Sequence, residues 1–529
     1  MKLKNLSRVI VAFAAFTLAL ASCKKDSTTT TTNNGGSGGG TQNTGPADSV
    51  PTKYAGGILG NVNTHSTFTF LAGKTYNITK GNVILVNADV VVQAGAQILF
   101  GGKPLKVTIG VNNPGKPGHD NALNINVPQI QANIALSNAK RKAQSLAVSK
   151  NLALSLPAPD TGSKSNVYSI YVTGGKKGNT CSFVANGTQT NHVVFTTQES
   201  NPVWPNGYWG GINVDSSATK VTLEWADVSH TGGSDSIAGN QYAIYVAGPH
   251  LSGATPIPVT IENSSVEYGV DDCTRMEGNL QLAIRGNVFK RQGSNDGDGI
   301  NIKSGSTGDV CYNYCWAGAN NSIKLNASTK DKTLITNVNV YNNTIIEGGW
   351  RKVGEASSGI LIDANAKGAC YNNLIIHCRN GFTLTGAADT LFYTGGLTGA
   401  AAKTHFSGLV NNNFIYAIVD SVAAHSYGFM QYGYKQPNDI SGLTVATQTN
   451  PKIVLFDPNT VGYTNQPNSY PDNNDPHLQT GSPAIGKGFS TSTHFYSSYT
   501  NYGAQWAPGE DIGAFQVTNS SKGNLRGNN

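Results

Sequence analysis

The chain has 529 residues, of which 38% are hydrophobic and 13% charged, and its formal net charge is +7. Setting aside Lys2, Lys4 and Arg8, which lie in a predicted leader that contains no acid, lowers that charge from +7 to +4. So weak a positive balance gives no support to nucleic-acid binding. After the leader, no apolar stretch is long enough to span a bilayer, which argues against anchoring by a transmembrane helix.

The first 22 residues form a predicted signal peptide, with a basic start, an apolar run and small residues before Cys23. The last three residues of this segment together with Cys23 read L-A-S-C, the lipobox pattern in which the cysteine is acylated. We therefore expect lipidation at Cys23 and contact with the membrane through the lipid anchor only. An ordinary signal peptide with an incidental cysteine is the alternative. Residues 23–50, rich in Thr, Gly, Asn and Ser, predict a flexible tether.

The folded domain is expected to cover residues 51–517. It begins with an N-terminal cap of alternating strands, which protects the open end of the first coil. Residues 103–165 interrupt the strand pattern and predict an insertion with one helix, because they are rich in helix formers after a Pro- and Gly-rich stretch. Residues 417–517 predict a loop-rich closing segment, and residues 518–529 predict a disordered tail.

Six similar phrases recur between Val259 and Ile415, namely VTIENSSV, LAIRGNVF, DVCYNYCW, VNVYNNTI, GACYNNLI and GLVNNNFI. The positions taken as equivalent are Asn263, Gly286, Asn313, Asn342, Asn372 and Asn412. They are separated by 23, 27, 29, 30 and 40 residues, a spacing typical of stacked solenoid coils. The recurring asparagine is expected to form hydrogen bonds from coil to coil at a turn.

The segments that follow these phrases alternate apolar and polar residues with period two, as in GINIKSG from Gly299 to Gly305. One face of each predicted strand therefore points into a core. The residues expected to stack in inward columns are Ile300 and Ile302, Ile323 and Leu325, Ile360 and Ile362, and Phe382 and Leu384.

Six cysteines remain after Cys23, an even number that permits disulfides without specifying any. Cys311 and Cys370 are expected at the same repeat position, two coils apart, with Val340 between them. Strands lie roughly 4.8 Å apart, and a disulfide tolerates a Cα separation of only about 7 Å. We therefore expect buried free thiols.

Further motifs resemble a known family. The strands from Tyr168 to Val214 contain VTGG, ANGT, VVFTT and WGGI, and the chain closes with GSPAIG and DIGAF. This succession resembles the right-handed parallel β-helix lipoproteins of Bacteroidetes type, in the pectate-lyase-like superfamily. The resemblance covers about Ala55 to Gln516. It implies an all-β right-handed parallel β-helix solenoid, with an N-terminal cap and one helical insertion, in the cell envelope at the outer membrane.

Two acidic turns, GVDDC and SNDGDG, are expected in adjacent coils. They contain Asp271, Asp272, Asp296 and Asp298. Close carboxylates repel one another unless a cation neutralises them, and calcium suits oxygen ligands. These four aspartates are therefore candidate metal ligands. Asp and Gly are also common turn formers, which is the simpler explanation of the same residues.

Downstream of these turns, Arg275, Lys303 and Lys324 are predicted on the outer face of successive coils. In β-helix polysaccharide lyases a cation neutralises a uronate carboxylate while a Lys or Arg removes the neighbouring proton. The three residues are therefore candidate catalytic residues. A charged, solvated face is the alternative.

Aromatic residues gather late in the chain, and Tyr427, Tyr432 and Tyr434 are candidate substrate-binding residues because rings stack on sugar faces. The same loops could instead close the core over the last coils.

Two functions follow from these patterns. The first is a lipid-anchored cell-envelope protein that binds a glycan, a polysaccharide or a partner along its outer face, without assigned catalysis. The second is a calcium-assisted polysaccharide lyase that cleaves uronate-containing polymers by β-elimination. A polygalacturonase-type hydrolase is disfavoured, because the chain contains no GHG motif and its DD pair precedes NDGD.

Overall fold

The computed structural model describes residues 50–102 and 167–526, apart from residues 205, 234, 236–241, 294–295, 328–332, 353–356, 364, 386–399, 402–408, 419, 427–435, 437, 458–471 and 490–502. The predicted signal peptide, Cys23, the predicted tether except for its last residue, and the predicted insertion at residues 103–165 lie outside the described residues. Within the described part of the chain, no helix is long and apolar enough to cross a membrane.

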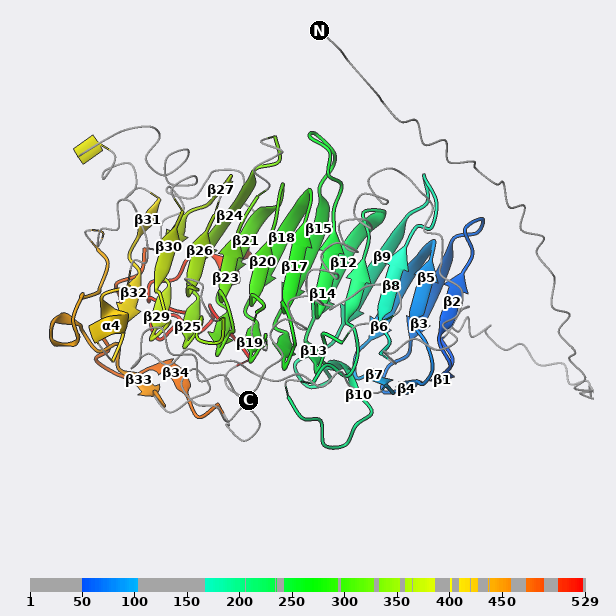
Figure 1. Cartoon of the computed structure of the whole chain (residues 1–529), viewed down its shortest axis with the longest axis horizontal. Helices are drawn as coiled ribbons and strands as arrows, with labels where there is room; N and C mark the ends of the chain where they lie inside the picture. The colour runs from blue at the N-terminus through cyan, green and yellow to red at the C-terminus, as the bar shows by residue number, and fades with distance from the viewer. Residues whose placement is uncertain are drawn as a thin grey trace, which may run out of the picture. The chain divides into compact units, whose positions relative to one another are not determined.

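Three long parallel sheets run through the unit Pro46–Asn529, and successive strands of each sheet lie side by side from the blue to the yellow end of the chain (Figure 1). Each sheet takes every third strand through most of the chain, so that one coil contributes one strand to each sheet. The chain is therefore an all-β, right-handed parallel β-helix, as the sequence predicts.

The strands of the three sheets have the following bounds. The first sheet contains β1 (Lys53–Tyr54), β4 (Thr75–Ile78), β7 (Gln97–Phe100), β10 (Val193–Thr197), β13 (Ala226–Ser229), β16 (Ser265–Glu267), β19 (Val288–Lys290), β22 (Tyr314–Trp316), β25 (Thr344–Ile346), β29 (Leu374–Ile376) and β32 (Phe414–Tyr416). The second sheet contains β2 (Gly57–Gly60), β5 (Val83–Val86), β8 (Ile170–Thr173), β11 (Ile212–Val214), β14 (Ile244–Ala247), β17 (Thr274–Glu277), β20 (Ile300–Ile302), β23 (Ile323–Leu325), β26 (Ile360–Ile362) and β30 (Phe382–Leu384). The third sheet contains β3 (Ser66–Phe70), β6 (Ala88–Gln93), β9 (Cys181–Asn186), β12 (Ala218–Glu224), β15 (Ile257–Glu262), β18 (Leu280–Arg285), β21 (Thr307–Cys311), β24 (Thr336–Tyr341), β28 (Cys370–Tyr371) and β31 (Val410–Asn411) with β27 (Ala366–Lys367) beside β24.

A few short elements lie outside these sheets. The strands β33 (Ile453–Leu455) and β34 (Asp475–Leu478) pair antiparallel. The short helices are α4 (Asp420–Ala423), η2 (Val445–Thr447) and α5 (Gly503–Trp506).

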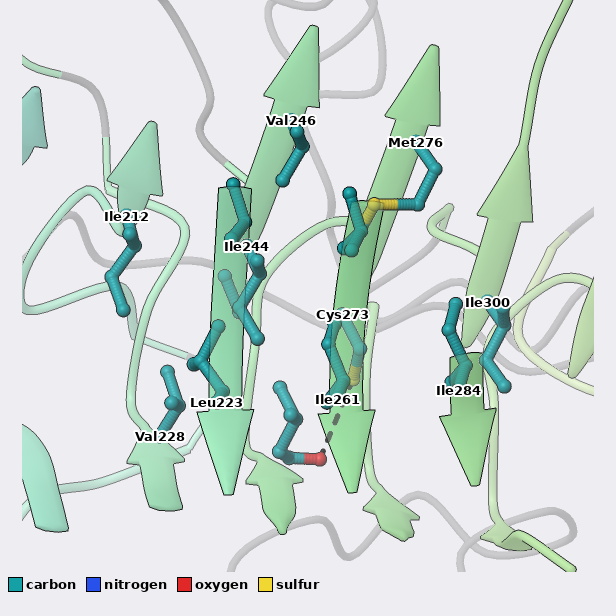
Figure 2. Packing of buried hydrophobic residues seen from close by; sticks show 14 of the residues in the cluster. Ile212, Leu223, Val228, Ile244, Val246, Ile261, Cys273, Met276, Ile284 and Ile300 are labelled. Atoms are coloured by element: carbon teal, nitrogen blue, oxygen red, sulfur yellow. Dashed lines mark hydrogen bonds between the residues drawn. The ribbon is translucent and has the colours of Figure 1, made fainter. Parts of the chain in front are cut away.

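The core lies between the three sheets. Figure 2 shows Val228 of the first sheet, Ile244 of the second and Leu223 of the third within one buried cluster. In the second sheet the register pairs Ile300 with Ile323, and the next two coils continue the column. The inward columns predicted from the period-two pattern are therefore confirmed, and each member is at most 2% exposed.

Two adjacent columns of turn residues explain the recurring asparagines. The first column has a left-handed backbone and consists of Asn263, Gly286, Tyr312, Asn342, Asn372 and Asn412. The second is a buried ladder formed by Asn287, Asn313, Asn343, Asn373 and Asn413. In this ladder Asn313 Nδ2 donates to Asn343 Oδ1 at 3.0 Å, and Asn343 repeats the bond to the next coil.

The equivalence assigned to Asn313 is therefore wrong by one residue. Tyr312 occupies the left-handed position of its coil, with φ 56°, and Asn313 belongs to the neighbouring ladder. The error arises because two adjacent positions both favour asparagine, the first because Asn tolerates the left-handed backbone and the second because its amide pairs with the next coil.

The same one-residue slip affects the cysteines. The register pairs Cys311 with Tyr341, whereas Val340 pairs with Cys370, so the two thiols point to opposite faces of the third sheet. The expectation that they share a repeat position is wrong. The expectation of buried free thiols is confirmed, because all six described cysteines are free and buried.

The end of the chain runs back along the left-handed turn column. Asn412 Nδ2 donates to Lys487 O at 3.0 Å, Asn342 Nδ2 donates to Asp511 O at 2.8 Å, and Asn524 Nδ2 donates to Tyr312 O at 3.0 Å. We call residues 484–489 and 503–526 the C-terminal return. Within the segment predicted as a tail, Asn524 bonds the carbonyl of Tyr312 and Arg526 forms an ion pair with Asp227.

Candidate functional site

The predicted cationic residues belong to three neighbouring strands of the second sheet, β17, β20 and β23 (Figure 1). Arg275 lies in β17, Lys303 directly follows β20, and Lys324 lies in β23. The middle row of the outer face of this sheet is fixed by the register and consists of Tyr171, Asn213, Tyr245, Arg275, Asn301, Lys324, Leu361 and Thr383. A second row lies two residues further along the chain in each coil and consists of Glu277, Lys303, Asn326 and Asp363, whose backbones are hydrogen-bonded from coil to coil. We call the face around these two rows the charged face.

A buried pair of carboxylates borders the charged face. Asp272 and Asp298 lie just before β17 and β20 and are 4% and 3% exposed. Asn301 Nδ2 donates to Asp272 Oδ2 at 2.9 Å and to Asp298 Oδ2 at 2.8 Å, and the Asp298 N–H donates to Asp272 Oδ1 at 2.7 Å. Asn321 donates to Asp298 Oδ1 through both its backbone and its side chain. The two carboxylates are therefore held by amides from neighbouring coils.

The protonation of Asp272 responds to this setting. Burial, followed by the charges of Asp271 and Asp298, raises the pKa of the Asp272 carboxyl to about 8. The positive charge of Arg275, whose Nη1 lies 3.9 Å from Asp272 Oδ2, acts against this rise in pKa. Asp272 therefore keeps its proton at neutral pH and loses it under mildly basic conditions.

Arg275 is held between an acid and a phenol. Its Nε lies 3.4 Å from Glu277 Oε2, and its Nη1 donates to the hydroxyl of Tyr242 at 2.7 Å. The guanidinium carbon also lies 4.8 Å from the centre of the Tyr242 ring, in cation–π range. The other oxygen of Glu277, Oε1, lies 4.0 Å from His250 Nε2. These contacts hold Arg275 in one position on the charged face.

Lys303 occupies the centre of the charged face and is partly exposed. Its ammonium group forms no hydrogen bond or ion pair with any residue that the structure describes. Burial, followed by the neighbouring charges of Arg275 and Lys324, lowers the pKa of the Lys303 amine to about 8, against the opposing effect of Asp298 and Asp272. Lys303 is therefore a cation at neutral pH that can lose its proton under mildly basic conditions.

Lys324 completes the row. Its Nζ lies 3.6 Å from Asp298 Oδ2, and this carboxylate is the main reason that the pKa of Lys324 is raised, although burial acts in the opposite direction. Beyond it, Asn326 donates to Asp363 at 2.8 Å. The charged face thus contains three cations, and its neighbouring acids already accept hydrogen bonds or ion pairs from the protein.

Each of the four predicted metal ligands already accepts a hydrogen bond from the protein, and Asp271 accepts one from the backbone N–H of Asp272 at 3.0 Å. Asp272 and Asp298 are bridged by Asn301, whereas Asp296 accepts from Asn320 at 3.2 Å and forms an ion pair with Lys352. The described residues contain no group of three or more His, Cys, Asp or Glu side chains that could hold a metal ion. Calcium takes six to eight oxygen ligands, which include backbone carbonyls and waters, and its binding at these residues stays a prediction.

The predicted substrate-binding residues Tyr427, Tyr432 and Tyr434 lie outside the described residues. Sequence reasoning missed Tyr242 and Tyr245, which adjoin Arg275 on the charged face. The segment AIYVA has the same period-two alternation as the strands that were recognised, and this signal places Tyr245 outward.

The fold and the charged face define a right-handed parallel β-helix with a cluster of cations across successive coils. Comparison with known proteins finds no matching protein family and no significantly similar curated protein or solved structure.

Proposed function

We propose that this protein binds an acidic glycan through the charged face. The observation that carries the proposal is the placement of Arg275, Lys303 and Lys324 on three successive coils, with the Lys303 ammonium making no ion pair with a described residue. Coils repeat every roughly 4.8 Å, so the cations can meet carboxylates along an extended polymer that crosses the strands. Charge complementarity of this kind supports recognition of uronates.

The cellular setting belongs to the same proposal. Lipidation at Cys23 and a tether at residues 23–50 would hold the β-helix at the cell envelope, at the outer membrane. The motifs that resemble the Bacteroidetes-type lipoproteins of the pectate-lyase-like superfamily support this location. In that place the charged face would meet extracellular or envelope polysaccharide.

A second candidate function is cleavage of the bound uronate polymer by β-elimination. One observation favours it, because a Lys303 amine with a pKa of about 8 can act as a base. Its nitrogen would take the proton next to the uronate carboxyl, the electron pair would form the C4–C5 double bond, and the glycosidic oxygen would leave and gain a proton from water. Arg275 would hold the carboxylate. No step is assigned to calcium, whose effect can be measured directly.

Calorimetric titration with polygalacturonate, alginate and neutral dextran tests the binding proposal. We expect the two acidic polymers to bind and dextran not to bind. Lys303→Met keeps the apolar stem of the side chain and removes the charge, and we expect it to weaken binding by roughly tenfold. Lys220→Met is the matched control, because Lys220 is exposed on the third sheet. Equal affinity of the wild type and the Lys303 variant would contradict the proposal.

Following the absorbance of the unsaturated product with the same polymers, with and without calcium, separates the two functions. If binding occurs and no product forms under either condition, the protein is a binding protein for these polymers. Product formation that disappears in Lys303→Met would establish the lyase.

A further inference from the structure

The middle row of the charged face continues without a break toward the amino-terminal coils. The register pairs Arg275 with Tyr245, Tyr245 with Asn213, and Asn213 with Tyr171. Three successive coils therefore present a phenol, an amide and a second phenol in line with the cations. The two tyrosines are partly exposed, and Asn213 is 8% exposed.

The two directions along this row differ in chemistry. Beyond Lys324, in the later coils, the row continues with Leu361 and Thr383, neither of which has an aromatic ring. On the amino side it offers aromatic rings and an amide, without a charged side chain in the row itself. The glycan proposed above would therefore meet different surfaces on the two sides of the cations.

Carboxylates near the tyrosines are already engaged. Tyr171 donates its hydroxyl to Asp235 Oδ2 at 2.8 Å, and Ser169 donates to the same oxygen at 2.5 Å. Asp215 accepts hydrogen bonds from Thr173 and from both the backbone and the side chain of Ser217. These acids therefore already accept hydrogen bonds from the protein's own side chains and backbone.

The aromatic part is physically joined to the cations. The rings of Tyr242 and Tyr245 have centroids 5.7 Å apart, and Tyr242 holds Arg275 by its hydroxyl and its ring. A ligand bound at Arg275 therefore adjoins Tyr245 on the next coil.

The geometry points to a subsite for neutral sugars formed by Tyr171, Asn213 and Tyr245, on the amino-terminal side of the cations. This inference rests on the proposed function and identifies the ligand class as a heteroglycan in which uncharged sugars adjoin acidic ones. Ring faces stack on the apolar faces of pyranoses, and the phenol hydroxyls suit sugar hydroxyls. Asn213 Nδ2 already donates to the carbonyls of Ile170 and Gly211, so Asn213 offers a sugar hydroxyl its Oδ1 as an acceptor. Coils spaced by roughly 4.8 Å nearly match one sugar of an extended chain, so successive sugars fall on successive coils.

Two series of oligosaccharides test the subsite with the full chain. Each member carries two galacturonates and none to three neutral hexoses, attached at the reducing end in one series and at the non-reducing end in the other. We expect the affinity to rise severalfold with each added hexose in one series only, because the neutral sugars occupy one side of the cations.

Single substitutions show which residue causes each gain in affinity. Tyr245→Ala should remove the gain from the first hexose and Tyr171→Ala the gain from the third, whereas Tyr171→Phe should keep most of it. Leu361→Ala is the matched control in the same row and should leave both series unchanged. Tyr245→Leu retains apolar volume and replaces Tyr245→Ala if the latter fails to fold.

The outcomes separate this inference from the proposed function. If the digalacturonate binds and Lys303→Met weakens it, but hexoses add nothing or the tyrosine variants keep every increment, the subsite is wrong and the acidic site remains. If no member of either series binds the wild type, both are wrong.

Discussion

Lys303 is a partly exposed cation that lies between two other cations, Arg275 and Lys324, on the charged face. Its position is unfavourable for its own charge, because burial and like charges both lower its pKa. A bound uronate would relieve this repulsion. At the scale of single residues, this repulsion supports the proposal that the charged face binds an anionic ligand.

The affinity for uronate oligomers should fall as the pH rises from about 7 to about 9, by roughly threefold to tenfold. Lys303, with a pKa of about 8, loses its positive charge in this interval, while Asp272, also near 8, gains a negative one. Arg275 stays charged, Glu277 has a lowered pKa and stays ionised, and Lys324 has a raised pKa and keeps its proton. Calorimetric dissociation constants across this range provide the measurement.

Lys303→Arg keeps the positive charge throughout the same range and is the control for this pH dependence. The affinity of Lys303→Arg for uronate oligomers should fall less steeply with pH than that of the wild type. The fall that remains would come from the ionisation of Asp272. An equally steep fall would assign the whole effect to Asp272. For the lyase alternative the sign is opposite, because the elimination rate should rise as Lys303 loses its proton.

Asn343 shows how one side chain joins three coils. Its amide donates to Asn373 Oδ1 and Val310 O, and its oxygen accepts from Asn313. Asn343→Ala should lower the free energy of unfolding by about 2–4 kcal/mol, because it leaves buried backbone groups without partners. Denaturant unfolding checks this, with Asn201→Ala at an exposed loop as control. A similar loss in both variants would contradict the ladder.

At the scale of elements, the period-two alternation of the second-sheet strands divides their residues into an inward set that packs in the core and an outward set that forms the charged face. Inward residues such as Ile323 stack with their copies in the core, and outward residues such as Lys324 build the charged face. The alternation predicts both sets, because successive side chains of a strand point to opposite faces. The sequence therefore places the cations correctly on one face before any contact is known.

Ile323→Ala should cost about 2–5 kcal/mol, because Ile323 is fully buried and the coils on both sides keep the cavity from collapsing. Ile58→Ala in β2 serves as control, since Ile58 is 51% exposed and its loss should stay within about 0.5 kcal/mol. Thermal or denaturant unfolding followed by circular dichroism measures both. Comparable destabilisation of the two variants would mean that the inward column does not carry the stability assigned to it.

At the scale of the whole molecule, the C-terminal return connects coils that are far apart in the sequence. Trp506 lies over Gly286, where an added Cβ would come within 2.6 Å of the indole ring, and Tyr341 donates its hydroxyl to Trp506 O at 2.9 Å. Arg526, near the end of the chain, forms an ion pair with Asp227. The return therefore covers the turn column of several coils.

Trp506→Ala should detach the return before the coils unfold, because its indole is 6% exposed and fills the space above Gly286. We expect faster proteolytic cleavage within residues 503–526 and a stability loss of about 3–5 kcal/mol. Limited proteolysis with mass spectrometry locates the cut. Val517→Ala is the control, since Val517 is 50% exposed. An unchanged cleavage pattern in Trp506→Ala would argue against a closing role.

The sequence by itself determined the coil repeat, the inward columns and the face that carries Arg275, Lys303 and Lys324, because a repeated unit and a period of two are local properties of the chain. Only the tertiary structure decided that Asn313 belongs to the ladder, that Asp296 pairs with Lys352 while Asn301 bridges Asp272 and Asp298, and that the end of the chain lies along the coils. These features depend on register and on contacts between distant segments. A one-residue shift in register moves a side chain to the opposite face, and no local pattern records which distant segment will cover a turn.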